Sequence, residues 1–119
     1  MTDRDRERTL ACLRDFFRFS DTAARVIVAR GKAAYDADEA LRLAAESILH
    51  KLGEAVARLP DDFTAANPEV AWRAMKATRN LVAHRYDQVD YDILWAALVQ
   101  RLPVEAERVR RILDQMDPR

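Results

Sequence analysis

The sequence predicts an all-α protein, folded as an antiparallel bundle of four to five helices. The 119 residues include only two glycines and four prolines, so residues that break helices are rare. Alanine, leucine, arginine and glutamate dominate, and β-branched residues are sparse. Apolar residues recur at spacings of three and four along most of the chain. The length is sufficient for one hydrophobic core, so we expect a single domain over residues 1–119.

Composition excludes several classes of function. Twenty basic and twenty acidic residues give a formal net charge of zero, so any nucleic-acid site must be a local patch. The single cysteine, Cys12, cannot form an internal disulfide, which favours a reducing compartment. The first residues carry no apolar signal core, and no apolar run approaches the roughly 20 residues of a membrane span. We therefore expect a soluble cytoplasmic protein with no membrane partner.

The first predicted helix runs from Asp5 to about Arg30 and carries two apolar stripes. Ser20 and Asp21 favour helix starts, but both stripes continue through them, so we expect one helix with a kink. Two stripes suit either the central helix of a bundle or a helix with one face against a second copy of the chain. The sequence leaves both open, and the second predicts dimerisation through helix faces. The stripes are Leu10, Leu13, Phe17, Ala24 and Ile27, and Cys12, Phe16, Phe19, Ala23 and Val26.

The second predicted helix extends from about Glu39 to Leu59. Gly31 should end the first helix, residues 32–37 should form a connection, and Asp38 is a suitable N-cap. The buried stripe of this second helix is expected to contain Leu41, Ala45, Ile48, Leu52, Ala55 and Leu59.

Three other positions on the second helix matter later. Gly53 weakens the helix unless a neighbouring backbone must come close. His50 lies opposite the buried stripe, and Glu54 lies off it, so we expect both side chains to face solvent.

The third predicted helix carries the residues of greatest chemical interest. Residues 60–67 are expected to be irregular, and Asn67 as N-cap with Pro68 in the first turn predicts a helix start, with the end at about Tyr86. At about 100° per residue, this helix presents two apolar faces beside a polar wedge. One face carries Trp72, Met75, Arg79, Val82 and Tyr86, the second carries Val70, Ala74, Ala77 and Leu81, and the wedge carries Arg73, Lys76, Asn80 and Asp87.

Two further helices complete the predicted bundle. Residues 87–90 form a turn, in which Asp90 can cap a short helix from Tyr91 to Arg101. Pro103 should end that helix and open the last one. The short helix is expected to bury Ile93, Leu94, Trp95, Leu98 and Leu102, and the last helix Val109, Ile112, Leu113 and Met116.

Arg79 and His84 stand out for their chemistry. Arg79 interrupts an apolar stripe, where a permanent charge needs a partner or an anion. A guanidinium can hold a phosphate by two parallel hydrogen bonds, and an imidazole moves protons near neutral pH. Together they suit cleavage of RNA, in which a base takes the proton of the ribose 2′-hydroxyl and a cation stabilises the charged phosphate oxygens. This chemistry needs no metal or other cofactor, and two histidines with one cysteine form no metal signature.

Local charge favours this hypothesis. Between residues 67 and 86 a single acidic residue, Glu69, opposes four basic ones. Tyr86 could stack on a base, bond a phosphate oxygen or be a site of modification. The candidates for RNA binding beside Arg79 are Arg73, Lys76 and Arg85.

The spacing of the two catalytic candidates constrains their geometry. Arg79 and His84 are five positions apart, so their side chains point roughly 140° from each other on an ideal helix. They cannot meet on one atom as a pair four residues apart would. Either the side chains reach across the wedge, or two chains bring their copies together. The second possibility agrees with the surplus apolar stripe on the first helix.

The motif Arg-Asn-x-x-x-His-x-Tyr at residues 79–86, followed by Val-Asp at residues 89–90, resembles the HEPN superfamily. Within it, the chain is most similar to the small HepT-like toxins that are paired with minimal nucleotidyltransferase antitoxins. Gly-Glu-Ala at residues 53–55 and Leu-Pro at residues 102–103 also resemble that group. The resemblance extends over residues 38–116 and is looser in the first helix.

This resemblance implies a metal-independent endoribonuclease toxin that acts on RNA as a homodimer, with a composite site at the interface. It implies that Arg79 and His84 are catalytic and that Asn80 supports them. It also implies that a cognate nucleotidyltransferase antitoxin attaches AMP to Tyr86. The added phosphate would place negative charge and bulk in the groove meant for RNA, which silences the toxin.

Two alternatives stay open at this point. The chain could be a non-catalytic helical partner of a nucleotidyltransferase that binds nucleic acid or nucleotide substrate without cutting it. It could also be a plain dimeric interaction module, in which Arg79 bonds an internal carboxylate and no cleft opens at His84. The other residues of interest on this helix have structural explanations as well. His84 suits a helix C-terminus, and Trp72 and Tyr86 suit a core.

Overall fold

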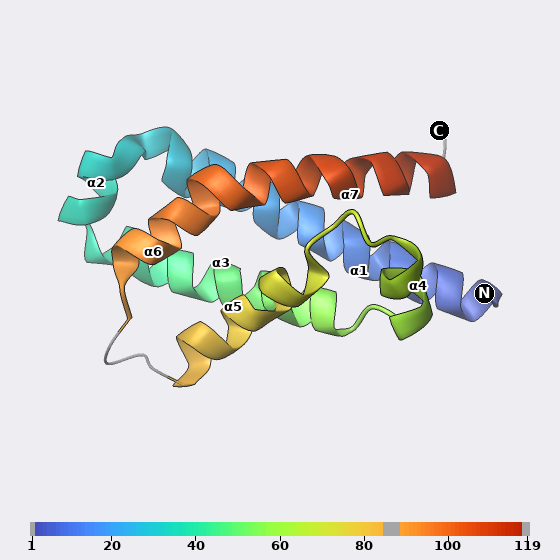
Figure 1. Cartoon of the computed structure of the whole chain (residues 1–119). Coiled ribbons are helices and arrows are strands. Elements are labelled where there is room, and N and C mark those ends of the chain that lie inside the picture. The colour runs from blue at the N-terminus through green and yellow to red at the C-terminus, as the bar shows by residue number, and fades with distance from the viewer. Residues whose placement is uncertain (1, 85–88, 118–119) are drawn as a thin grey trace.

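The computed structural model describes residues 2–84 and 89–117, with the backbone alone for residues 80–84. Every element in these ranges is helical, which confirms the all-α prediction. The elements in Figure 1 are α1 (Asp3–Thr22), the π-helical turn η1 (Ala23–Ile27), the 3₁₀ turn η2 (Val28–Arg30), α2 (Gly31–Ala37), α3 (Glu39–Ala57), α4 (Asp61–Ala66), α5 (Trp72–His84), α6 (Tyr91–Ala96), the π-helical turn η4 (Ala97–Arg101) and α7 (Leu102–Met116).

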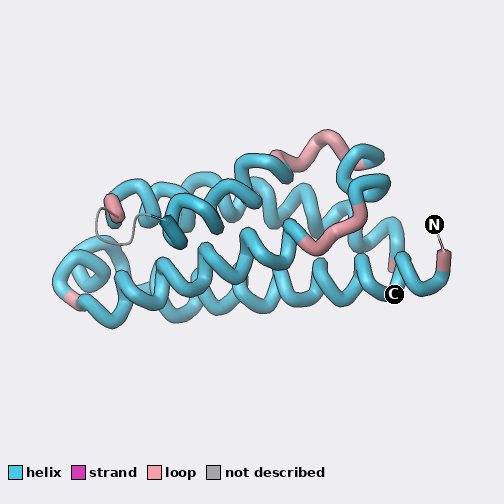
Figure 2. The backbone as a smooth tube through the Cα atoms, turned by 90° about the horizontal axis from the view of Figure 1, so that it is seen from below, coloured by secondary structure: helices cyan, strands magenta, loops and turns pink. Residues whose placement is uncertain are grey.

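The long helices α1, α3, α5 and α7 run alternately in opposite directions, so the predicted antiparallel bundle is confirmed (Figure 1). The most extensive contacts join α3 to α5 and α3 to α1, and α7 packs on α1. Figure 2 shows both ends of the chain at the same end of the bundle, where the Arg6 guanidinium donates a hydrogen bond to the Met116 carbonyl. Helix α3 is therefore the central element against which α5 is positioned.

The first helix is continuous, as the uninterrupted stripes predicted, and the π-helical turn η1 widens it locally. Helix α1 passes without a break through η1 and η2 to Gly31, whose φ of 86° ends it. Both stripes lie mostly inside one chain, because α3 and α7 cover them. Ala24 and Val26 are exposed at the far end. This burial favours the interpretation of the first helix as a central helix of the bundle. It leaves little of the two apolar stripes exposed for contact with a second copy of the chain.

The prediction of an irregular segment at residues 60–67 is wrong, since residues 61–66 form α4. The connection predicted at residues 32–37 is also wrong, because these residues belong to α2. The predicted start of the third helix at Pro68 is also wrong, because α5 begins at Trp72. The Asn67 side-chain amide donates to the Phe63 carbonyl, 2.8 Å away, and so ties Asn67 to α4. The carboxylate of Glu105 instead accepts the Ala71 N–H at the start of α5, over 2.9 Å.

The C-terminal third forms one helical rod, in which α6, η4 and α7 follow one another directly. Pro103 lies in the first turn of α7 and does not break the rod, because a proline N–H is not needed there. The expected burial is confirmed for most positions, but Ile93 is 53% exposed and faces away from the core. His50, expected in solvent, is partly buried. The Asp38 and Asp90 caps are confirmed, each by a carboxylate that accepts a backbone N–H.

Candidate active site

Helix α5 carries Arg79 and packs tightly on α3 at that residue. A Cβ placed on Gly53 of α3 would lie 2.7 Å from the Arg79 Cβ and 3.0 Å from its backbone nitrogen. Real Cβ contacts do not reach such a distance, so only glycine permits this approach. The sequence-based expectation that Gly53 is tolerated for a close backbone contact is therefore confirmed.

The Arg79 guanidinium forms an ion pair with Glu54, the residue that follows this glycine. Arg79 Nη1 lies 3.2 Å from Glu54 Oε1, and the two side chains are 27% and 44% exposed. Glu54 thus reaches solvent as expected, but it is not merely solvated. A guanidinium has five N–H donors, and in the described part of the chain Glu54 is its sole ion-pair partner. No other described residue forms an ion pair with its remaining donors, which can hold an anion at a surface that solvent reaches.

Thr78 fixes the same part of α5 and is a residue that the sequence analysis missed. Its hydroxyl lies 3.2 Å from the Leu49 carbonyl of α3 and 2.7 Å from the Met75 carbonyl of its own helix. A threonine within a helix often bonds a carbonyl of the preceding turn, which is the signal that could have revealed it. Together with Gly53, it sets the register of α5 on α3 and hence the position of Arg79.

The outer side of α5 differs from its prediction. Arg73 and Lys76 are exposed, as a polar wedge requires, but Ala74 and Ala77 of the second apolar face are exposed too. Only Val70 from that face is described as buried, at 4% exposure. The second face of α5 is therefore not covered by the described part of this chain.

The remaining motif residues lie partly or wholly outside the described structure. Asn80 and His84 are placed by their backbone within α5, and their side chains are outside the described atoms. Arg85 and Tyr86 lie outside the described residues altogether. Since α5 continues without a break to His84, the helical spacing that separates this position from Arg79 holds for the backbone.

The chain that follows the motif is anchored to α2 and α3. The Tyr35 hydroxyl donates to the Tyr91 carbonyl over 2.8 Å, and the Tyr91 hydroxyl donates to Glu46 over 2.7 Å. Burial raises the pKa of Tyr35 to about 12, and the hydrogen bond to Glu46 raises the pKa of Tyr91. Both phenols are therefore protonated donors at neutral pH.

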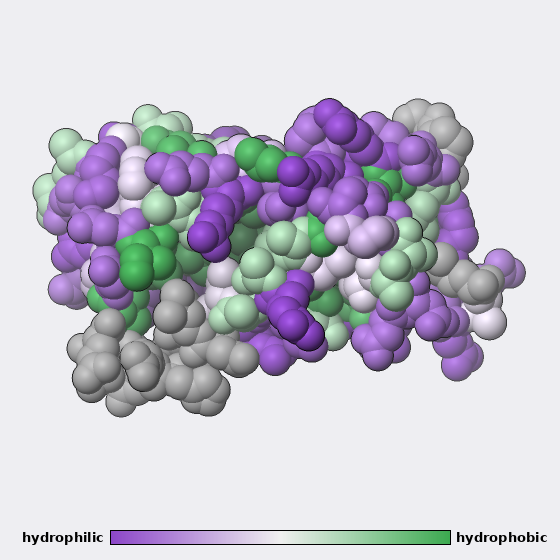
Figure 3. Space-filling view, in the orientation of Figure 1, coloured by the Kyte–Doolittle hydropathy of each residue, from purple (hydrophilic) through white to green (hydrophobic). Residues whose placement is uncertain are grey.

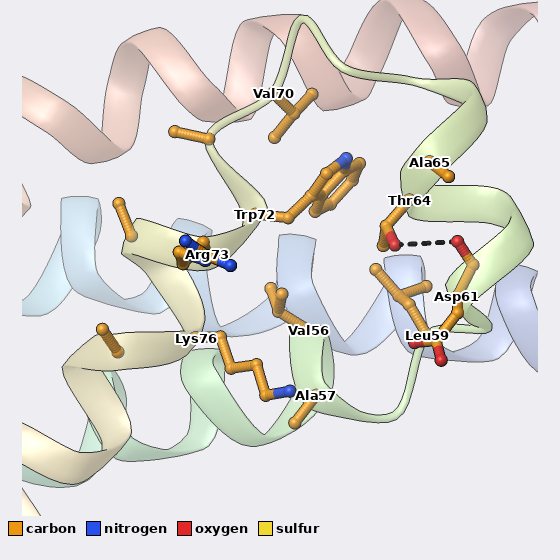
Figure 4. Close-up of a pocket in the computed structure, with 13 residues that line it drawn as sticks. Val56, Ala57, Leu59, Asp61, Thr64, Ala65, Val70, Trp72, Arg73 and Lys76 are labelled. Atoms are coloured by element: carbon orange, nitrogen blue, oxygen red, sulfur yellow. Dashed lines mark hydrogen bonds between the residues drawn. The ribbon is translucent and has the colours of Figure 1, made fainter.

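A broad hollow of about 850 Å³ lies along the first half of α5 (Figure 4). Its walls come from the end of α3, from α4 and from the first half of α5, and we call it the α4–α5 hollow. The residues that line it are Val56, Ala57, Leu59, Asp61, Thr64, Ala65, Val70, Ala71, Trp72, Arg73, Ala74, Lys76 and Ala77.

The described ranges hold neither a metal-binding cluster nor a membrane-spanning helix. No three histidine, cysteine, aspartate or glutamate side chains there gather closely enough to hold a metal ion. None of the described helices has the length and hydrophobicity needed to cross a membrane.

Comparison with known proteins finds a ribonuclease family and relatives that are named as ribonucleases. The family described as "HepT-like: Ribonuclease HepT-like" matches residues 6–112. A protein named "Putative RNase MJ0127" from Methanocaldococcus jannaschii is 30% identical over 69 residues, which are 58% of this chain and 57% of that protein. A "Probable ribonuclease HepT" from Thermococcus cleftensis is 33% identical over 66 residues, which are 56% of this chain and 60% of that protein. The chain thus spans about three fifths of the length of these relatives. No solved structure matches the sequence significantly.

Proposed function

The chain belongs to the HepT-like ribonuclease family, and on that premise we propose that it is a metal-independent endoribonuclease toxin that cuts RNA with Arg79 and His84. The observation that carries this proposal is the partly exposed ion pair between Arg79 and Glu54. A permanent charge stands on the α3–α5 seam with one partly exposed carboxylate as its partner and with donors left for an anion. The family match extends across both catalytic candidates.

The reaction uses the chemistry of these two side chains. The neutral imidazole of His84 accepts the proton of a ribose 2′-hydroxyl, and the 2′-oxygen attacks the adjacent phosphorus. The bond from phosphorus to the 5′-oxygen breaks, which yields a 2′,3′-cyclic phosphate and a 5′-hydroxyl that takes up the proton. Arg79 holds the phosphate oxygens as negative charge develops on them. Asn80, one position along the helix, supports the pair as a neutral hydrogen-bonding group.

The active unit in this proposal is a homodimer with a composite site. Two helix positions five residues apart diverge by roughly 140°, so one chain does not readily bring both side chains to one phosphate. A two-fold related copy supplies the missing group, because each residue of one chain then faces its complement on the other.

Regulation in this proposal falls on Tyr86. A cognate nucleotidyltransferase antitoxin transfers AMP from ATP, with the phenolic oxygen attacking the α-phosphorus and pyrophosphate leaving. The attached phosphodiester adds negative charge two residues from His84, where it repels the RNA phosphate. The support is the match of Tyr86 to the family motif. Co-expression with the partner followed by mass measurement of the peptide that contains Tyr86 tests this step.

The cleavage itself is tested with purified protein and RNA in the presence of a chelator. Cleavage should persist, and Arg79→Ala and His84→Ala should each abolish it while the helical circular dichroism is kept. The second candidate function is that of a non-catalytic partner of a nucleotidyltransferase, which the exposed cations Arg73 and Lys76 would also serve. RNA that shifts in mobility but is never shortened would favour this candidate over the ribonuclease.

A further inference from the structure

The α4–α5 hollow begins one helical turn from the catalytic candidate Arg79. Ala57 and Lys76 line it, and they lie three positions from Glu54 and Arg79 on α3 and α5. Residues three apart on a helix are neighbours on its surface. The hollow therefore lies further along the same α3–α5 seam on which the Arg79–Glu54 ion pair stands.

The rim of the hollow carries positive charge that the described chain does not neutralise. Arg73 and Lys76 are exposed, and Figure 4 shows the Lys76 side chain extended across the mouth of the hollow toward Ala57. Neither cation forms an ion pair with another described residue. Elsewhere, by contrast, Arg58 is paired with Asp15 and Lys32 with Asp36. Two free cations beside a hollow can hold a phosphate.

The interior of the hollow suits the rest of a nucleotide. Five alanines line the hollow, and Trp72 and Val70, which are 9% and 4% exposed, close its floor, so a base meets a largely apolar surface. Thr64 and Asp61 stand on the α4 side, where the Thr64 hydroxyl donates to the Asp61 carbonyl over 3.1 Å (Figure 4). The Asp61 carboxylate accepts hydrogen bonds and repels phosphate. A bound nucleotide is thus oriented with its phosphate at α5 and its base toward α4.

A protein partner fits this hollow less well than a nucleic-acid strand does. Protein interfaces depend on large apolar or aromatic anchors. The large exposed hydrophobic side chains of the described chain are Val26, Leu43, Ile93 and Val104, and none of them lines the α4–α5 hollow. Ile93 and Val104 border a different hollow, between α5 and α6, and Figure 3 shows hydrophobic surface gathered over α6.

We propose that the α4–α5 hollow binds the nucleotide of a single-stranded RNA next to the cleaved phosphate, with its phosphate on Arg73 and Lys76 and its base on the alanine-lined apolar surface beside Trp72. This inference rests on the proposed function for the identity of the ligand. It adds a second point of attachment for the strand, which aligns the 2′-hydroxyl and phosphate at Arg79 and His84. It also assigns a role to the exposed cations that is separate from chemistry.

Binding can be measured without cleavage, by the fluorescence of Trp72. The chain has two tryptophans, so a Trp95→Phe background leaves Trp72 as the sole reporter at the hollow. The ligand is an RNA tetranucleotide with 2′-O-methyl groups, which cannot be cut. Its addition should change the Trp72 emission and give a dissociation constant. Binding can be followed separately by a label on the tetranucleotide. If the label shows that the protein is saturated while the Trp72 emission is unchanged, the proposal is overturned.

Two variants of that background isolate the hollow. Arg73→Ala/Lys76→Ala removes the phosphate contacts, and Ala65→Phe fills the hollow from an exposed position on α4 without changing charge. Each should weaken tetranucleotide binding at least about tenfold, since two phosphate contacts or the whole base contact are lost. The matched control, Arg25→Ala/Arg30→Ala, removes two exposed cations at the other end of the bundle and should weaken it far less. Circular dichroism verifies that each variant is folded.

The outcomes separate this inference from the proposed function. Equal affinities in all three variants would overturn the inference, even if the protein cuts RNA. Loss of dimerisation in Ala65→Phe with tetranucleotide affinity kept would also overturn it, by making the hollow a contact between proteins. Tight binding that the hollow variants weaken, by a protein that never cuts RNA, would support the inference and contradict the proposed function.

Discussion

The guanidinium of Arg79 lies 3.2 Å from the carboxylate of Glu54, beside the tight contact of α3 and α5 at Gly53. An ion pair between partly exposed groups contributes little to folding, about 0–1 kcal/mol. Its value lies in position, because it holds a flexible cation at one place on the surface. The hypothesis of a plain interaction module required an internal carboxylate, and Glu54 is 44% exposed. The pair is therefore accessible to a substrate that competes for the same guanidinium.

The first prediction concerns Glu54→Gln. We expect the midpoint of thermal unfolding to be nearly unchanged, since the pair is partly exposed. The cleavage rate constant should fall by about tenfold, because Arg79 is no longer held against the developing charge. The dissociation constant for RNA should not weaken, as a negative charge is removed. A variant that loses affinity but keeps its rate would show that Glu54 does not position Arg79.

The second prediction concerns Gly53→Ala. Alanine is the better helix former by about 1 kcal/mol, but the new Cβ would lie 2.7 Å from the Arg79 Cβ. We expect a net loss of about 1–3 kcal/mol in the free energy of unfolding, because α5 must shift away from α3. Denaturant unfolding measures it. The control is Ser47→Ala at an exposed position of the same helix, which should be neutral or slightly stabilising. Equal stability of both variants would mean that the close approach is not maintained in solution.

The third prediction concerns the chemistry of the cation. Arg79→Lys keeps a positive charge but loses the planar fork that binds two phosphate oxygens. We expect cleavage to fall by about a hundredfold or more, as when one donor to a transition-state oxygen is removed. Gel assays of a labelled RNA in a chelator measure the rate. Full activity in Arg79→Lys would reduce the role of this residue to simple charge.

The fourth prediction concerns the anchor that follows the motif. The pKa of Tyr35 is about 12 in the folded chain, above the usual value of about 10 for an unfolded one. Between these values the unfolded state has lost a proton that the folded state keeps, so stability falls as pH rises through that window and is complete below it. Unfolding midpoints measured from pH 8 to 12 should show this decline.

The control for this prediction is Tyr35→Phe. This variant lacks the hydroxyl that donates to the Tyr91 carbonyl, so it should lose about 1–3 kcal/mol at neutral pH. It should also show a shallower decline at high pH. An identical pH dependence in the two proteins would assign the decline to other groups, such as Lys32, whose pKa the hydrogen bond to Asp36 also raises.

Local chemistry explains why much of the fold could be predicted. Asp38 and Asp90 were recognised as caps because each accepts an N–H from two residues further along the chain. The stripe of α3 was recognised because a central helix repeats its burial regularly. The start of α5 could not be placed correctly, because the Ala71 N–H at that start donates to Glu105, 34 residues away. Such a partner leaves no periodic trace in the sequence.

The candidate site was predictable only in part, for a related reason. Arg79 was singled out by charge within an apolar stripe, but its partner depends on how α3 and α5 are aligned. That alignment is set by the contact at Gly53 and the Thr78 hydroxyl, which act between helices. The exposure of Ala74 and Ala77 was not foreseen, since alanine is common both in cores and on helix surfaces. The α4–α5 hollow likewise exists only once α4 is folded.

The most direct test of the central claim is activity in a mixture of Arg79→Ala and His84→Ala, each inactive alone. Random pairing makes half of all dimers in the mixture heterodimers of the two variants. If the site combines Arg79 of one chain with His84 of its partner, each heterodimer has one intact site of two. We predict that an equimolar mixture, unfolded and refolded together, recovers about a quarter of the wild-type RNA cleavage in a chelator. A mixture as inactive as its components would contradict a composite Arg79–His84 site.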